Sequence, residues 1–398
     1  MNKFGIGQPV LRDEDIKFIS GKGLYTGDIY LENQTYMYVL RSNIAHGEIK
    51  NIDISEALNS EGVINIFIGK DLSEAGIKDM PTNFKAKNKD DSDMFTPERS
   101  AIAIDIVRHV GDPIAIIIAE TTEYAKNASE LIDVDIEELP SVTSASEAIK
   151  DDAPQVWNNA KNNLCFDWEM GEEEKANKAF ENADTVVEIE LINNRIVPNS
   201  METRGAIASY DKESNKYELR CSSQGVHSIR DRVSELLNIE AKDLRVITTD
   251  VGGGFGMKLF NYPEYICSLF ASKKVGRPVK WISERTEAFL SDTHGRDHLT
   301  KAKMALDKNG IFLGVKINTT ANLGAYLSNF AIFIPTLAGT AMLAGCYKTP
   351  AIYVNVLGVF TNTPAVDAYR GAGRPEASFV IERLVDIAGI KTGLGPIE

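Results

Sequence analysis

The stretch that most constrains this chain is the glycine-rich run TDVGGGFGMK, Thr249 to Lys258. Its glycines lack a Cβ and can take a positive φ, so backbone N–H groups there can approach a polyanionic or oxo-bearing ligand. Two nucleotide motifs fail on spacing. The third glycine of G-x-G-x-x-G would fall on Met257, and Lys258 has neither the preceding glycine nor the following serine or threonine of a phosphate loop. The run is therefore either a loop for another kind of cofactor or a connector between a strand and a helix.

A second segment, TNTPAVDAYRGAGRPEASF at Thr361 to Phe379, has the same character. Its glycines permit a tight loop, and Pro375 suits the first turn of a helix, which we predict from Pro375 to Ala388. Arg370 precedes this helix. Its charged fork of donors could clamp an oxygen ligand or a cofactor phosphate. The alternative is an arginine paired with one of the 57 acidic residues.

Gln224 lies where an alternating run, Lys216 to Ser222, meets a helical pattern with Ser228 as its expected N-cap. A glutamine on such a strand-to-helix turn can present a neutral donor and a neutral acceptor to a bound group. It can equally be a turn residue that ties down the local backbone.

The chain is too long, at 398 residues, for one compact core, and its mixed pattern predicts an α+β fold. We expect an N-terminal extension (1–20), a first domain (21–140), a linker (141–160) and a second domain (161–398). β-rich runs and one helical stretch mark the first domain. In the second, we expect a helix from Pro263 to Val275 and a hairpin at Asp307 to Gly310.

Metal sites are not evident from spacing. Four widely separated cysteines, which we expect to be reduced core thiols, form no C-x-x-C pair, so the chain is not expected to hold a metal cluster of its own. The segment SDTHGRDH, Ser291 to His298, has two histidines four residues apart. Gly295 between them predicts a loop instead of a metal-binding helix.

Composition excludes several classes of protein. The formal net charge of −14 disfavours a nucleic-acid or anionic-membrane surface. No apolar run approaches the ~20 residues of a membrane span. The start, MNKFGIGQPVLRDED, has no apolar core of a secretory signal, so we expect a cytoplasmic protein.

Taken together, GGGFG and AYRGAGRPE, in this order and at this separation, resemble the large, molybdenum-binding subunit of the xanthine dehydrogenase, aldehyde oxidase and aerobic carbon monoxide dehydrogenase family. Shorter pieces extend the resemblance over nearly the whole chain. They include GQPVLRDEDIKFISGKGLYTGDI, Gly7 to Ile29, and VRHVGDPIAIIIAET, Val107 to Thr121. The resemblance implies an a/b hammerhead domain followed by part of the molybdopterin-binding domain.

The implied reaction is hydroxylation of an electrophilic carbon with oxygen from water, at a molybdenum-molybdopterin cofactor that we expect to be the cytosine dinucleotide. The chain has no flavin or iron–sulfur motif, so separate FAD-binding and [2Fe-2S] subunits are the implied partners. The resemblance places three residues beside the metal, mostly through its ligands, and the glutamine contacts the oxo ligand. The implied metal-pocket residues are Gln224, Phe255 and Arg370, and Gly253, Gly254 and Gly256 join them as cofactor-binding residues.

Three positions depart from the purine-oxidising members of this family. Leu259 stands where they have a glutamate, Ala338 aligns with their second substrate-gripping arginine, and Ala372 matches their ring-stacking aromatic residue. Carbon monoxide oxidisers carry a cysteine in the arginine loop, and AYRGAGR has none. The expected substrate is therefore a small aldehyde or an N-heterocycle.

Two alternatives remain open. The chain could be a non-catalytic binding or assembly fragment, or one half of a split molybdenum subunit, because it stops at GLGPIE, partway through a motif that the family continues. The family's glutamate base is expected beyond Glu398. We therefore count the remaining C-terminal half of the molybdenum-binding subunit among the implied partners.

Overall fold

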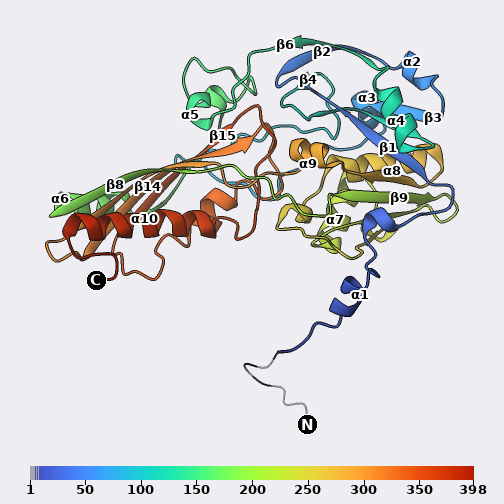
Figure 1. Cartoon of the computed structure of the whole chain (residues 1–398). Helices are drawn as coiled ribbons and strands as arrows, with labels where there is room; N and C mark the ends of the chain where they lie inside the picture. Colours follow the sequence, from blue (N-terminus) through green and yellow to red (C-terminus); the bar gives the residue numbers. More distant parts are fainter. Residues whose placement is uncertain (1–4, 6, 8) are drawn as a thin grey trace.

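The computed structural model describes residues 5, 7 and 9–398. Part of the expected extension 1–20, namely residues 1–4, 6 and 8, lies outside the described residues. The predicted α+β class is confirmed: helices pack on three sheets (Figure 1).

The largest sheet joins distant parts of the chain. Its seven strands, in spatial order, are β11 (Leu244–Ile247), β10 (Lys216–Cys221), β9 (Gly205–Asp211), β12 (Val279–Ile282), β1 (Thr35–Arg41), β5 (Pro113–Ala119) and β3 (Val63–Ile68). The junction is the parallel pair β1 and β12, in which Thr35 lies opposite Val279. Every residue of β5 is buried, as expected for a central strand covered on both faces. Residues on both sides of the predicted 141–160 linker thus share one sheet.

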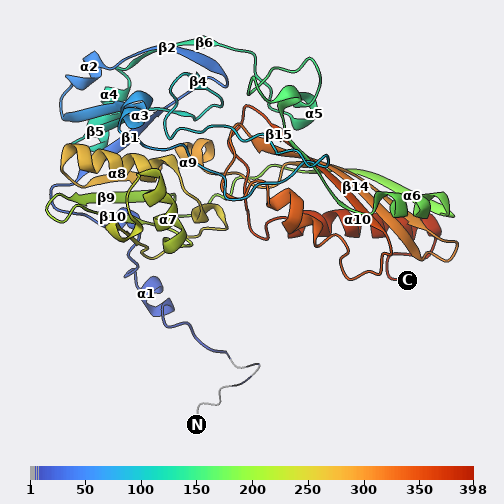
Figure 2. The ribbon, with the colours of Figure 1, turned by 180° about the vertical axis from the view of Figure 1, so that it is seen from behind.

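A five-stranded sheet forms the other end of the molecule. Its order is β7 (Leu164–Gly171), β15 (Ile352–Phe360), β14 (Phe312–Gly324), β13 (His298–Leu306) and β8 (Thr185–Asn193). The long helix α10 (Arg374–Thr392) runs along one face, and α6 (Glu173–Glu181) packs on the other (Figures 1 and 2). The hairpin predicted at Asp307 to Gly310 joins β13 to β14.

The third sheet is small: β4 (Ile106–Val107), β2 (Gly47–Asp53) and β6 (Asp133–Glu138). The remaining α-helices are mostly short: α1 (Asp15–Ile19), α2 (Ser55–Leu58), α3 (Gly69–Glu74), α4 (Thr122–Ser129), α5 (Ala145–Ala148), α7 (Val226–Leu236), α8 (Pro263–Val275) and α9 (Arg285–Ser291). Helix α8 is almost wholly buried against the seven-stranded sheet, which explains why its sequence is apolar on more than one face.

Some of the predicted helix boundaries match the structure and others do not. Helix α8 has the predicted bounds, and α10 extends its predicted helix to Thr392. The N-cap prediction was wrong: α7 begins at Val226 after an extended Gly225, so Ser228 lies inside the first turn. One cysteine also differs from the expectation of core thiols, because Cys346 is exposed while Cys165, Cys221 and Cys267 are buried.

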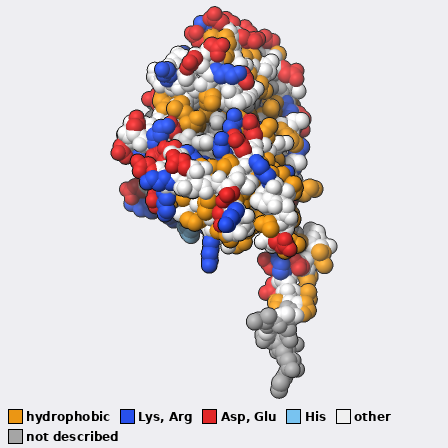
Figure 3. Space-filling view, turned by 90° about the vertical axis from the view of Figure 1, so that its left-hand side faces the viewer, with side chains coloured by type: hydrophobic (Ala, Val, Ile, Leu, Met, Phe, Trp, Pro, Cys, Tyr) orange, Lys and Arg blue, Asp and Glu red, His pale blue; other side chains and the backbone are white. Residues whose placement is uncertain are grey.

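The end of the molecule that Figure 3 shows is mixed in character. Acidic, basic and apolar side chains are interspersed over it. Within the described part of the chain, no helix has the length and apolar character needed to cross a membrane. The segment around α1 projects away from the body, and none of the residues of α1 is buried (Figure 1).

Candidate functional site

Two hydrogen bonds, one between backbone groups and one from a backbone amide to a side chain, bring the glycine run, the glutamine turn and the arginine loop together. The Arg370 amide donates to the Phe255 carbonyl at 2.9 Å. The Gly256 amide donates to Oε1 of Gln224, also at 2.9 Å. Residues more than 110 positions apart in the chain therefore share one small surface, and the side chains of Gln224, Phe255 and Arg370 are all exposed on it.

Gln224 sits on the turn between β10 and α7, as its position predicted. The backbone amide of Gln224 donates to the Lys258 carbonyl at 3.0 Å, so the turn is tied to the end of the glycine run. Oε1 is occupied by the Gly256 amide. The Gln224 side chain is exposed, and its Nε2 has no hydrogen-bond partner among the described residues. Nε2 is therefore available as a donor.

The glycine run uses its glycines for two different reasons. Gly253 and Gly256 have φ of +98° and +100°, a conformation that disfavours side chains. Gly254 instead allows close approach, because a Cβ there would lie 2.4 Å from Oε1 of Gln224. Phe255 also has a positive φ, +54°, although it is not glycine. Such strain is found preferentially at functional sites.

A buried ion pair that the sequence did not reveal anchors the start of the run. Lys258 is fully buried, and its Nζ donates to the carbonyl of Glu202 at 2.9 Å and to Oε2 of Glu202 at 2.8 Å. The Gly252 amide donates to the same Oε2 at 2.8 Å. Burial lowers the pKa of Lys258, and the Glu202 carboxylate opposes this shift. Lys258 is thus a brace within the protein instead of a ligand for a phosphate.

Arg370 has the exposure that a ligand-binding role requires. Its side chain makes no ion pair with any described acidic residue. The alternative interpretation, an arginine paired with an acidic side chain, therefore has no support in the structure. The loop turns sharply at Ala372, with φ of +47°, and α10 begins at Arg374 with Pro375 in its first turn. The positive end of a 19-residue helix dipole therefore lies just beyond Arg370.

The three expected substrate-pocket residues divide into two groups. Leu259 lies at the glutamine turn, where a Cβ on Gly225 would be 3.3 Å from Cδ1 of Leu259. Ala338 is buried in a short π-helical segment, Ile334–Ala338, and its backbone packs against Gly373. Ala372 is on the arginine loop. Leu259 and Ala372 thus flank the shared surface on the glutamine side and on the arginine side.

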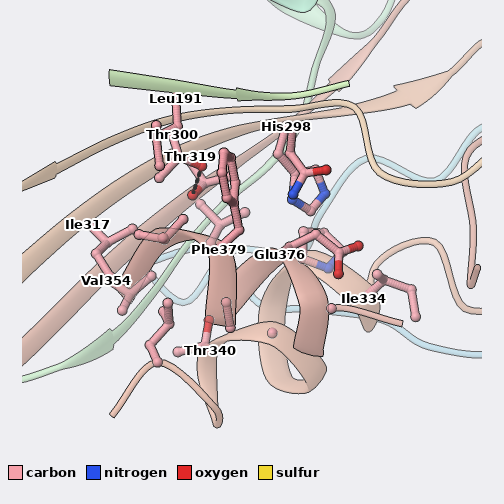
Figure 4. A pocket seen from close by; sticks show the side chains of 18 residues that line it. Leu191, His298, Thr300, Ile317, Thr319, Ile334, Thr340, Val354, Glu376 and Phe379 are labelled. Atoms are coloured by element: carbon pink, nitrogen blue, oxygen red, sulfur yellow. Dashed lines mark hydrogen bonds between the residues drawn. The ribbon is translucent and has the colours of Figure 1, made fainter. Parts of the chain in front are cut away.

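The two histidines of SDTHGRDH lie on a loop and at the start of β13, as the glycine between them predicted, and they face different surroundings. Nδ1 of His294 lies 3.2 Å from the Arg195 guanidinium, and burial together with that charge lowers the pKa of His294 to about 4. His298 lines a cavity between the five-stranded sheet and α10 (Figure 4). Among the described residues, no three His, Cys, Asp or Glu side chains cluster as metal ligands.

This cavity is distinct from the shared surface. Its walls come from β8, β13, β14 and β15 on one side and from α10 and the π-helical segment on the other (Figure 4). None of Gln224, Phe255 and Arg370 lines it. The chemistry of the shared surface, by contrast, is that of two exposed donor groups, the side-chain amide of Gln224 and the guanidinium of Arg370. Such a set suits an oxygen-rich anionic group.

Comparison with known proteins identifies relatives along the whole chain. Residues 156–398 match the family model described as the molybdopterin cofactor-binding domain. Residues 20–140 match the model described as the aldehyde oxidase and xanthine dehydrogenase a/b hammerhead domain. Both matches agree with the resemblance drawn from the sequence motifs.

Individual relatives include the carbon monoxide dehydrogenase large chain of Hydrogenophaga pseudoflava, which is 32% identical over 97% of this chain and 48% of its own length. The crystal structure of quinoline 2-oxidoreductase from Pseudomonas putida 86 superposes with a TM-score of 0.89 at 30% identity, covering 98% of this chain and 49% of that one. The chain spans about half the length of these two relatives. The nicotinate dehydrogenase large molybdopterin subunit of Eubacterium barkeri is 26% identical over 99% of this chain and 88% of its own length.

Proposed function

The chain belongs to the molybdopterin-binding family of xanthine dehydrogenases, aldehyde oxidases and carbon monoxide dehydrogenases, and from this membership we propose that it forms the cofactor-binding part of a molybdenum hydroxylase. Its substrate would be a small aldehyde or an N-heterocycle, hydroxylated with oxygen from water. The observation that carries the proposal is the shared surface, where Arg370 and Gln224 converge on the glycine run through two hydrogen bonds of 2.9 Å.

The residues present fit such a cofactor. Gly254 lets the Gln224 side chain lie directly against the glycine run, and the side chains of Gln224 and Arg370 are both exposed and carry hydrogen-bond donors. In the proposed assignment, the amides of Gly253 and Gly254 and the side chains of Gln224 and Arg370 hold the cofactor. Gly256 contributes to the site by fixing Gln224 through its amide, and Phe255 covers the cofactor. The cofactor supplies the redox chemistry at molybdenum when bound. The protein orients it and excludes water from one side.

Substrate selection rests on what the surface lacks. A purine presents a polar edge, and Leu259, Ala338 and Ala372 provide neither charge nor an aromatic ring to meet it, so a purine would leave buried polar groups unpaired. The relatives named above for quinoline and nicotinate act, by their names, on N-heterocycles. The arginine loop carries no cysteine, which disfavours carbon monoxide.

We also propose the cytosine dinucleotide form of the cofactor, separate FAD-binding and [2Fe-2S] subunits, and a further polypeptide segment that completes the molybdenum-binding part. The relative from Eubacterium barkeri, of which the match covers 88%, supports the possibility that this segment is a separate chain. A non-catalytic assembly fragment is the weaker candidate, because Gln224, Phe255 and Arg370 are all retained and converge.

The test is purification of the intact complex from its native source, followed by metal and pterin analysis and steady-state kinetics. We expect stoichiometric molybdenum and a higher kcat/KM for aldehydes or N-heterocycles than for xanthine or carbon monoxide. Absence of molybdenum would refute the assignment as a hydroxylase. A higher kcat/KM for xanthine would refute only the inferred substrate class.

A further inference from the structure

The segment SDTHGRDH is not explained by the proposed cofactor residues, and its backbone is unusual. Two consecutive residues that are not glycine, Arg296 and Asp297, have φ of +65° and +66°. This left-handed conformation is sterically disfavoured for both, and two such residues in succession need compensating contacts. Asp297 has one, since its Oδ2 accepts from Nε of Arg195 at 2.6 Å. At this turn the two neighbouring side chains contact different parts of the protein: Asp297 binds Arg195, and Arg296 binds the arginine loop.

Arg296 reaches the arginine loop. Its guanidinium donates to the Tyr369 carbonyl at 3.2 Å and to the Arg370 carbonyl at 2.8 Å. The same guanidinium lies 5.0 Å from the centre of the Tyr369 ring. The side chain of Arg296 is almost wholly buried, so these bonds form where water competes little.

Glu376 holds Arg296 from the other side. Its Oε1 accepts from Nη1 of Arg296 at 2.9 Å, and both side chains are less than a tenth exposed. Glu376 lies in the first turn of α10, so the pair links the turn at Arg296 to the helix that begins beyond the loop. The second carboxylate oxygen, Oε2, has no partner among the described residues, and Glu376 borders the cavity that His298 also lines (Figure 4).

We infer that Arg296 is a positioning residue: by holding the carbonyls of Tyr369 and Arg370 it fixes the direction in which the Arg370 side chain leaves the loop, and Glu376 fixes Arg296. Only a fork of donors can hold two successive carbonyls and a carboxylate at once, and a lysine cannot reproduce this planar geometry. The inference rests on the proposed function where it assigns Arg370 to the cofactor. The bracing contacts themselves do not depend on that assignment.

The test is hydrogen–deuterium exchange on the intact complex, read at peptides that cover residues 368–373. The Arg370 amide is protected by its bond to the Phe255 carbonyl. We expect Arg296→Gln to speed its exchange at least tenfold and Arg296→Lys to have a smaller effect in the same direction. The matched control is Arg383→Gln, which breaks an exposed ion pair with Asp386 on α10. This substitution should leave the exchange rate of residues 368–373 unchanged.

The bracing role is overturned if a folded Arg296→Gln complex shows native exchange at residues 368–373. If that variant does not fold, Glu376→Gln carries the same readout, because it keeps the size of the side chain and removes the charge that holds Arg296; native exchange at residues 368–373 in this variant would likewise overturn the bracing role. Steady-state kinetics then separate the bracing role of Arg296 from the assignment of Arg370 to the cofactor. We expect kcat/KM to fall at least tenfold in Arg296→Gln, while Arg383→Gln stays at the native value. Faster exchange with native kcat/KM and native molybdenum content would keep the brace and refute the assignment of Arg370 to the cofactor.

Discussion

At the scale of single residues, Gln224 has two tasks that substitution can separate. Its Oε1 holds the Gly256 amide, and its Nε2 is free to donate to a bound ligand. We expect Gln224→Ala in the intact complex to fold normally, since the side chain is exposed, and to lower kcat by roughly a hundredfold, the typical effect of losing one preorganised donor. Steady-state kinetics with the best substrate measure this, and a native kcat would return Gln224 to a purely structural role.

Gly254 gives a sharper test, because a single methyl group is enough. A Cβ at this position would lie 2.4 Å from Oε1 of Gln224, so Gly254→Ala must displace that side chain or the loop. We expect a marked loss of bound molybdenum, measured by metal analysis of the purified complex. Gly27→Ala is the matched control, because nothing lies within 4 Å of a Cβ there. Full molybdenum occupancy in Gly254→Ala would contradict the proposed role of the Gln224 side chain and the glycine run in holding the cofactor.

Which residues could be predicted from the sequence depended on whether their signal was local. Gln224, Arg370 and the glycine run stood out by residue type and by position at turns, although their types alone left a structural role open. Glu202 and Arg296 could not be predicted as braces. Glu202 binds Lys258, 56 positions away, and Arg296 binds the Arg370 carbonyl, 74 positions away. Nothing in the intervening sequence indicates that these residues come into contact.

At the scale of elements, a buried ion pair ties β1 to α8. Arg41 donates to Oε1 of Glu264 at 2.6 Å, and Glu264 also binds the fully buried Arg204. Breaking a buried ion pair typically costs about 3 to 5 kcal/mol. Because Arg204 still compensates Glu264 when Arg41 is removed, we expect Arg41→Met to lower the free energy of unfolding by about 3 kcal/mol, the lower end of that range, in urea titrations.

A control for Arg41→Met is available between the same two parts of the chain. Arg277 pairs with Glu120 in the open, and such exposed pairs contribute about 0 to 1 kcal/mol. Arg277→Met should therefore shift the urea midpoint little. Equal destabilisation by the two substitutions would contradict the distinction between the buried and the exposed pair.

The same network predicts a dependence on pH. Burial raises the pKa of Glu264, but Arg204 and Arg41 outweigh it and lower the pKa to about 2, from an ordinary value of 4.5. A carboxyl whose folded pKa is depressed stabilises the protein above its unfolded pKa, and this contribution is lost as pH falls from 4.5 towards 2. In Arg41→Met the pKa is less depressed, so less of this contribution remains to be lost in acid. Urea titrations at several pH values measure the difference.

Local elements were predictable, and the pairing of distant strands was not. The turn signal at Asp307 to Gly310 located the hairpin between β13 and β14, and helix α8 has its predicted bounds. The parallel pairing of Thr35 with Val279 joins segments separated by more than 240 residues, and periodicity contains no information about such partners. The seven-stranded sheet that spans the predicted linker was therefore outside the reach of sequence patterns.

At the scale of the whole molecule, large apolar side chains are exposed in two places. Phe255 is 40% exposed although it stands at the centre of the proposed site, and Leu337, Met342 and Phe379 are further exposed apolar side chains near the π-helical segment and α10. Apolar surface of this kind marks a contact with another polypeptide or a ligand.

We therefore expect a polypeptide of these 398 residues, supplied with the cofactor, to hydroxylate nothing. A general base is typically worth about 100 to 10,000-fold in rate, and two carboxylates close to the three segments of the shared surface are already engaged: Glu202 pairs with Lys258, and Glu376 pairs with Arg296. An assay with an artificial electron acceptor removes the need for flavin and iron–sulfur subunits. Repeating it with the remaining molybdenum-binding segment added should restore turnover. Turnover by the 398 residues alone would mean that one of their own carboxylates is the base, and Glu202→Gln and Glu376→Gln would then identify it.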